Sequence, residues 1–128
     1  MDNVKQSVYT FLKDREWLEL PPGDLAKSIS IEAAELLEHF QWTNPSVSEL
    51  KADNTELNEL ADEIADIMIY AIELCIILGL DPENVIKTKI DKASRKYPAE
   101  RMVSDRDASS SNPANNAYYK IKSQNREK

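Results

Sequence analysis

Two pairs of acidic residues in this sequence share a spacing of three positions. Glu32 and Glu35 form the first pair, and Glu63 and Asp66 form the second. At about 100° of rotation per residue, residues three apart lie on one side of an α-helix, so each pair presents two carboxylates to the same surface. If the two helices pack with these surfaces together, four carboxylates meet in one pocket and require a compensating cation. A site made only of carboxylate oxygens favours Mg²⁺, with Mn²⁺ as an alternative, over zinc.

The chemistry that such a site supports is hydrolysis of a polyphosphate. Mg²⁺ in proteins typically keeps some of its waters and shares its coordination shell with substrate phosphates. The alternative is that these acids only solubilise a helix face, which is the usual role of carboxylates three residues apart. Two observations weigh against that alternative: both pairs are embedded among apolar residues, and no lysine or arginine occurs between Glu56 and Leu80 to form helical ion pairs.

The composition excludes several other kinds of site. The chain has two glycines and one histidine, His39, so it contains no glycine-rich phosphate loop and no multi-histidine zinc site. A ferritin-like di-iron centre would require Glu-x-x-His motifs, whereas His39 lies four residues after Glu35 and no second histidine exists.

The net charge and the single cysteine restrict the partners and the compartment. With 16 basic and 23 acidic residues the net charge is −7, which disfavours binding to nucleic acid. The most apolar segment, residues 64–80, contains Asp66 and Glu73, so no membrane span is expected. One cysteine, Cys75, permits no intramolecular disulfide, and the amino terminus lacks the apolar core of a signal peptide, so a cytoplasmic protein is expected.

Apolar periodicity and turn residues predict four main helices. The expected helices cover residues 4–17, residues from an N-cap at Asp24 to the break at 43–45, residues from an N-cap at Thr55 to a C-terminal Gly79, and residues 82–96 after an Asp81 N-cap. A short helical turn is expected at 47–52. No alternating strand pattern is present, so the fold class is all-α.

The third of these helices, ELADEIADIMIYAIELCIIL at 59–78, is apolar over most of its circumference. Short neighbouring helices cannot cover so much apolar surface, so we expect a helical bundle completed by homo-oligomerisation. Residues 1–100 are expected to form the domain, and residues 101–128, which include SDRDASSSNPANN, a polar and flexible C-terminal tail.

Several sequence blocks in the same order resemble a known family. These blocks are DREW, EAAELLEHFQW, ELADEIADIMIYAIEL and KIDKASRKYP, and the similarity covers roughly residues 8–98. Together with the two acidic pairs, they resemble the MazG-like nucleotide pyrophosphohydrolases and, more specifically, their dCTP pyrophosphatase-like branch. The resemblance implies an all-α homodimer or homotetramer that hydrolyses a nucleoside triphosphate to the monophosphate and pyrophosphate with Mg²⁺.

The resemblance also implies roles for individual residues. Glu32, Glu35, Glu63 and Asp66 would be the metal ligands and catalytic residues, and Glu32 would position or deprotonate the attacking water. These roles agree with the ability of a bound metal to neutralise charge on phosphates.

Three aromatic residues match family positions near the nucleoside: Trp17, Trp42 and Tyr70. Trp42 and Tyr70 fall on the same helical arcs as the acids, which would suit stacking on a base, although packing in the core or an interface is the alternative.

Two basic residues of the KIDKASRKYP block, Lys89 and Arg95, are candidates for binding phosphate oxygens, with compensation of a helix dipole as the alternative. Ala93 departs from the family, because relatives of the dCTP type commonly have asparagine there. An enzyme acting on dUTP or another altered nucleotide therefore stays open. From a different class, a non-catalytic helical module that dimerises and binds a protein partner also stays open.

Overall fold

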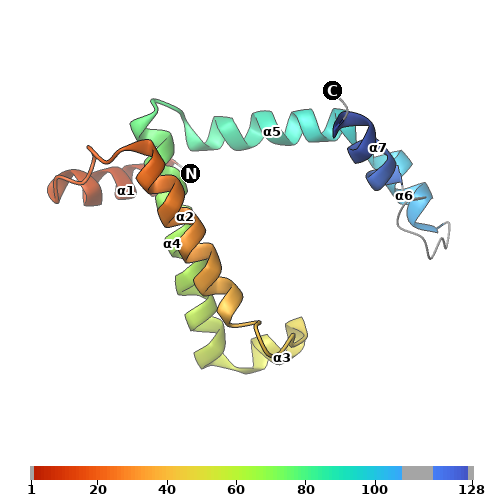
Figure 1. Cartoon of the computed structure of the whole chain (residues 1–128), viewed down its shortest axis with the longest axis horizontal. Coiled ribbons are helices and arrows are strands. Elements are labelled where there is room, and N and C mark those ends of the chain that lie inside the picture. Colours follow the sequence, from red (N-terminus) through yellow and green to blue (C-terminus); the bar gives the residue numbers. More distant parts are fainter. Residues whose placement is uncertain (1, 108–116, 127–128) are drawn as a thin grey trace. The chain divides into compact units, whose positions relative to one another are not determined.

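The computed structural model describes residues 2–107 and 117–126, and every regular element in these ranges is an α-helix (Figure 1). The all-α fold class is therefore confirmed. Within the described ranges, no helix has the length and apolar character needed to cross a membrane. The helices are α1 (Asp2–Asp14), α2 (Pro22–Glu38), α3 (Val47–Ala52), α4 (Asn54–Ile77), α5 (Pro82–Lys96), α6 (Ala99–Asp107) and α7 (Ala117–Arg126).

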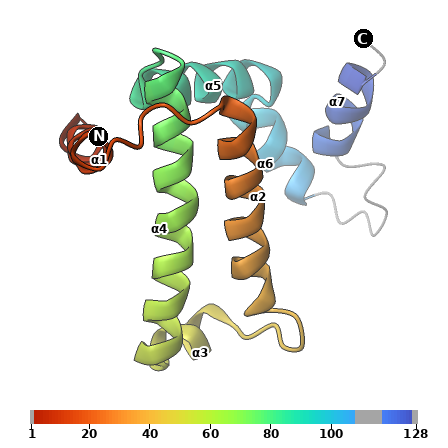
Figure 2. The same cartoon turned by 60° about the vertical axis from the view of Figure 1, so that its left-hand side comes forward.

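The two longest helices, α2 and α4, pack side by side and run in opposite directions (Figure 2). Leu25 on α2 is fully buried, and Leu60 on α4 is 5% exposed. On each helix, the side chains that face the other helix recur every three or four residues. The same face of α2 therefore stays in contact with the same face of α4 over several turns. This pairing holds the two acidic motifs opposite each other.

Helix α1 packs against α4 and completes a small apolar core. Val8 and Leu12 of α1 are buried with Ile72 of α4, and Leu18 and Ile76 pack against this cluster. The core is small for the apolar content of α4, because several of its apolar side chains remain exposed in the single chain.

The ends of the helices confirm some expected caps and correct others. Gly79 has a positive φ of 70°, and the segment at 47–52 is helical as predicted. The N-cap of α2 is Pro21 rather than Asp24, and the N-cap of α4 is Asp53 rather than Thr55. The Asp53 side chain accepts a hydrogen bond from the backbone N–H of Glu56, which fixes the start of α4 two residues earlier than predicted.

The chain divides into two compact units, residues 1–83 and 84–128. In the second unit, α6 and α7 pack together, the Tyr97 and Tyr118 rings stack at 5.0 Å, and Ile121 is buried. Residues 108–116 and 127–128 of the predicted polar tail lie outside the described residues. The division into a domain at 1–100 and a flexible tail at 101–128 stays a prediction.

Candidate active site

The acids of the two motifs meet between α2 and α4. Carboxylate oxygens of Glu32, Glu63 and Asp66 all lie within 4.8 Å of one another. Glu35 lies next to this group, because its side chain and charge help to raise the pKa of both Glu32 and Glu63. The structure thus brings together the four residues that the sequence singled out.

The electrostatics of this group disfavour four ionised carboxylates. Burial raises the pKa of Glu32 above its usual 4.5, and the hydrogen bond and charge of Glu35 raise it further, with smaller contributions from Asp66 and Glu63. Burial also raises the pKa of Glu63, as do the charge and hydrogen bond of Glu35 and the charge of Asp66, whereas His39 lowers it. A cation among these oxygens would reverse the effect by stabilising the ionised forms.

The donor atoms fit a hard divalent cation. Oε2 of Glu32 and Oε2 of Glu63 are both buried and without a hydrogen-bond partner. Buried polar atoms normally have a partner, so two buried carboxylate oxygens on facing helices fit a site that binds a cation. All of the donors are carboxylates, which suits Mg²⁺ or Mn²⁺.

The three predicted aromatic residues differ in their placement. Tyr70 is half-buried on α4, one turn beyond Asp66. Trp17 follows α1 and packs edge-on against Phe11 at 5.9 Å between ring centroids. Trp42 is 87% exposed and lies beyond the end of α2, so the prediction that it continues the helical arc of the acids is wrong. The chain leaves the helix at His39, before Trp42 is reached.

The two predicted basic residues lie on α5 in the second unit and are both exposed. Arg95 forms an ion pair with Asp91 one turn away on the same helix. Binding of phosphate by Lys89 and Arg95 stays a prediction.

Two features near the acids carry no role in the sequence-based prediction. His39, the C-cap of α2, pairs with Glu56 of α4, with 3.0 Å between Nδ1 and Oε1. Glu73, on the same stripe of α4 as Asp66 and Tyr70, is only 1% exposed, and its Oε1 has no hydrogen-bond partner. Helical spacing already places His39 on the same arc as Glu32, and Glu73 on the same arc as Asp66. Which residues lie opposite His39 and Glu73, however, depends on how α2 and α4 pack.

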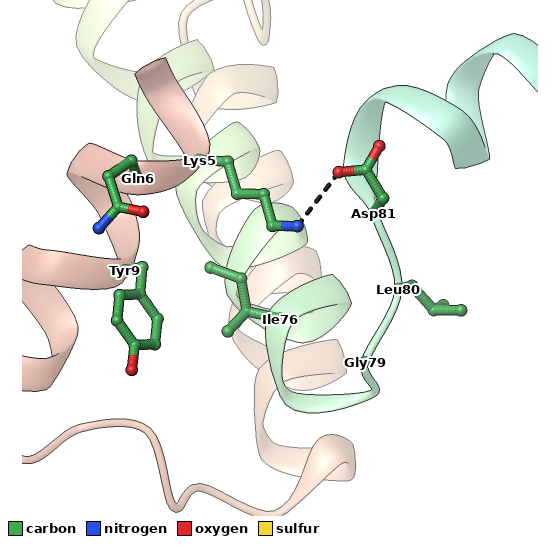
Figure 3. A pocket seen from close by; sticks show the side chains of 7 residues that line it. All are labelled: Lys5, Gln6, Tyr9, Ile76, Gly79, Leu80 and Asp81. Carbon is green, nitrogen blue, oxygen red and sulfur yellow. Dashed lines mark hydrogen bonds and ion pairs between the residues drawn. The ribbon is translucent and has the colours of Figure 1, made fainter. Parts of the chain in front are cut away.

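A separate cavity of about 390 Å³ lies between α1 and the end of α4 (Figure 3). Nζ of Lys5 donates a hydrogen bond to Oδ1 of Asp81 across the cavity, at 3.1 Å. The side chains of Tyr9 and Ile76 also line the cavity. None of the four acids lines this cavity, so it is distinct from the acidic site.

Comparison with known proteins places this helical pair in a family. Residues 27–106 match the model of the MazG-like family, and the chain belongs to that family. It is 27% identical to human dCTP pyrophosphatase 1 over 101 residues, and equally so to the Bos taurus protein of that name over 100 residues. Each alignment covers 77% of this chain and 59% of the relative, so the chain spans about 59% of the length of these curated relatives.

A solved structure supports the same placement. The chain is 41% identical to a pyrophosphatase from Archaeoglobus fulgidus DSM 4304, with a TM-score of 0.65. The match covers 77% of this chain and 92% of the archaeal chain. The archaeal protein thus shares both sequence and fold with the region that contains the four acids.

Proposed function

We propose that this protein is a Mg²⁺-dependent nucleoside triphosphate pyrophosphohydrolase. Its products would be the nucleoside monophosphate and pyrophosphate, and dCTP or a modified dCTP is the leading substrate. The observation that carries the proposal is the cluster of Glu32, Glu63 and Asp66 between α2 and α4, with two buried, unpartnered oxygens and with Glu35 acting on the same carboxyls. Membership of the MazG-like family and the named activity of the mammalian relatives support it.

In this proposal Glu32, Glu35, Glu63 and Asp66 hold the metal, Mg²⁺ or Mn²⁺. The bound ion would neutralise charge on the phosphates and lower the pKa of a coordinated water. Glu32 orients the attacking water and accepts its proton as the water oxygen bonds to the α-phosphorus. The bond from that phosphorus to the oxygen bridging to the β-phosphate breaks, and pyrophosphate leaves.

The nucleoside end of the substrate is assigned to the aromatic residues. Tyr70 lies one turn from Asp66 on α4, which suits contact with a sugar or base next to the metal-bound phosphates. Trp17 and Trp42 are exposed in the single chain and offer stacking surfaces, while Lys89 and Arg95 offer charges for phosphate oxygens. Ala93 stands where the resemblance to the dCTP-type branch leads us to expect asparagine, so dUTP or another altered nucleotide is the second candidate.

We also propose that the active form is a homodimer or homotetramer in the cytoplasm. Several apolar side chains of α4 are exposed in the single chain, including Ile64 and Met68. Met68 also lines a largely apolar groove with Val4 and Ile69, and a contiguous apolar surface of this kind commonly marks an interface.

The test is a panel of deoxynucleoside and nucleoside triphosphates incubated with Mg²⁺, with monophosphate and pyrophosphate measured separately. Glu63→Gln is expected to lower kcat/KM on the order of 100-fold, because it removes one charged ligand. Asp62→Asn is the matched control, since it removes the neighbouring exposed charge and should retain activity.

Each of four outcomes would contradict the proposal. Absence of turnover with every triphosphate, or unchanged turnover by Glu63→Gln, would exclude this enzyme activity. Release of inorganic phosphate instead of pyrophosphate would place the cleavage at a different bond. A protein without activity that still self-associates would favour a non-catalytic helical module.

A further inference from the structure

A second group of potential metal ligands lies between α2 and α4, outside the four-acid site. Ligand atoms of His39, Glu56 and Glu59 all lie within 4.8 Å of one another. Nδ1 of His39 and Oε1 of Glu56 are 3.0 Å apart, and both side chains are partly buried, whereas Glu59 is exposed. The group therefore combines one imidazole nitrogen with two carboxylates and has an open side.

This second group repeats the first at a distance of seven residues along each helix. Glu32 plus seven gives His39, Glu63 minus seven gives Glu56, and Asp66 minus seven gives Glu59. Because α2 and α4 are antiparallel, a shift of seven residues in opposite directions moves both helices by the same two turns. The backbone arrangement that gathers Glu32, Glu63 and Asp66 is thus used twice.

The change of one donor alters the metal that the group would prefer. In the four-acid site every donor is an oxygen, whereas His39 contributes nitrogen to the second group. Imidazole nitrogen favours first-row transition metals, such as Zn²⁺ and Co²⁺, over Mg²⁺. We propose that His39, Glu56 and Glu59 form a second cation site, selective for a divalent transition metal.

The direct His39–Glu56 contact is compatible with this site. Ligand bonds of about 2.1 Å separate neighbouring donor atoms by about 3.0 to 3.4 Å on a metal, depending on the coordination geometry. The observed 3.0 Å separation of Nδ1 and Oε1 already matches this range. A metal ion would replace the imidazole–carboxylate contact by two ligand bonds without separating the helices, and Glu59 would supply the third ligand from the solvent side.

The second site does not take part in the proposed phosphate chemistry. Seven residues of helix correspond to about 10 Å at 1.5 Å per residue, well beyond the 3.5–4 Å that separates two cooperating catalytic metals. Its ion instead joins the carboxyl end of α2 to the amino end of α4, next to the connection through α3. The site is therefore structural and can be tested without measuring turnover.

The only histidine of the chain, His39, provides a specific readout. The experiment is a Zn²⁺ titration of protein without a histidine tag, monitored by the imidazole ¹⁵N resonances. A Glu63→Gln background weakens the four-acid site, so that binding there does not dominate. Zn²⁺ is expected to shift the Nδ1 resonance with saturation at one equivalent, while Mg²⁺ at the same concentration leaves it unchanged.

Variants assign the two carboxylates. Glu59→Gln should raise the apparent Kd for Zn²⁺ at least about tenfold, since a carboxylate ligand is lost from an exposed position where folding is not at risk. Glu38→Gln, which removes an exposed charge next to His39, is the matched control and should change the Kd less than about twofold. An imidazole spectrum that ignores Zn²⁺, or a Zn²⁺ response that is equal in Glu59→Gln and Glu38→Gln, would overturn the proposal.

Discussion

At the scale of single residues, Glu73 differs from the other acids of α4. Its side chain is 1% exposed and its Oε1 has no hydrogen-bond partner, whereas Glu63 and Asp66 belong to the shared acidic cluster. Burial raises the pKa of Glu73 above the usual 4.5. An acid whose pKa is raised by folding binds its proton more tightly in the folded protein than in the unfolded chain.

The sign of the resulting pH effect follows from this difference. The folded protein gains stability as pH falls toward about 4.5, and loses it as pH rises through the raised pKa of Glu73. Glu73→Gln removes the charge while keeping the size of the side chain. We expect this variant to have a higher Tm than wild type at about pH 8, and a smaller advantage at about pH 5.

Thermal unfolding at both pH values, without divalent ions, measures this effect. Glu38→Gln on α2 is the control, because it removes an exposed carboxylate of the same type. The quantity compared is the difference in Tm between each variant and wild type at the same pH. The contributions of Glu32 and Glu63 cancel in this difference, because both residues are present in the variant and in wild type. A lower Tm for Glu73→Gln at both pH values would show that the buried carboxylate is stabilising.

At the scale of helices, the same turn geometry ends α1 and α4 with different residues. After α4, Gly79 has φ 70°, and the N–H of Leu80 donates to Cys75 O at 2.8 Å. After α1, Glu16 has φ 58°, and the N–H of Trp17 donates to Leu12 O at 2.9 Å. Both are Schellman-type ends with a left-handed residue, where glycine is favoured and glutamate is strained.

Gly79→Ala should lower the stability of the fold, and Glu16→Gly should raise it. Gly79→Ala meets no atom within 4 Å, so its cost is conformational, about 1 kcal/mol. Glu16→Gly relieves about 1–2 kcal/mol of left-handed backbone strain. Part of this gain is lost because glycine has more conformational freedom in the unfolded chain. The expected net stabilisation is about 0.5–1 kcal/mol. Urea unfolding measures both changes, and equal signs for the two variants would contradict the assignment.

These helix ends also show what a sequence pattern can predict. Gly79 has no competing stop signal nearby, and Asp81-Pro82 has no competing start signal. Helix α4 ends just before Gly79, and helix α5 begins at Pro82, as predicted. Before α4, Asp53 and Thr55 both have side chains able to cap, and only the hydrogen bond from Glu56 N–H to Asp53 identifies the cap. Where two candidates lie two residues apart, local pattern does not decide between them.

The pairing of helices is the information that periodicity lacks. Helical spacing placed Glu32 and Glu35 on one surface and Glu63 and Asp66 on another, and charge compensation gave a reason for the two surfaces to meet. The partner of His39 and the burial of Glu73 depend on which turn of α2 lies opposite which turn of α4. That register is set by packing between helices, which the pattern of one helix does not contain.

At the scale of the whole molecule, the exposed apolar surface bears on the proposed oligomer. A groove of about 410 Å³ lies between α1 and α4, lined mainly by apolar side chains that include Val4, Met68 and Ile69. Met68 is 49% exposed and Ile69 37% exposed in the single chain. Burial of such side chains against a second chain stabilises association by about 25 cal/mol per Å² of apolar area removed from water.

Met68→Glu should therefore weaken self-association, because it places a charge in the apolar groove. We expect light scattering during size-exclusion chromatography to show dissociation at protein concentrations at least about tenfold higher than for wild type. Val47→Glu is the matched control, since Val47 on α3 is 68% exposed and does not line the groove. Equal masses for wild type and Met68→Glu would exclude this groove as the interface. None of the four acids lines the groove, so Met68→Glu leaves the acidic site itself unchanged. Turnover by dissociated Met68→Glu therefore decides whether one chain carries a complete site. Loss of activity on dissociation would mean that a second chain contributes to substrate binding.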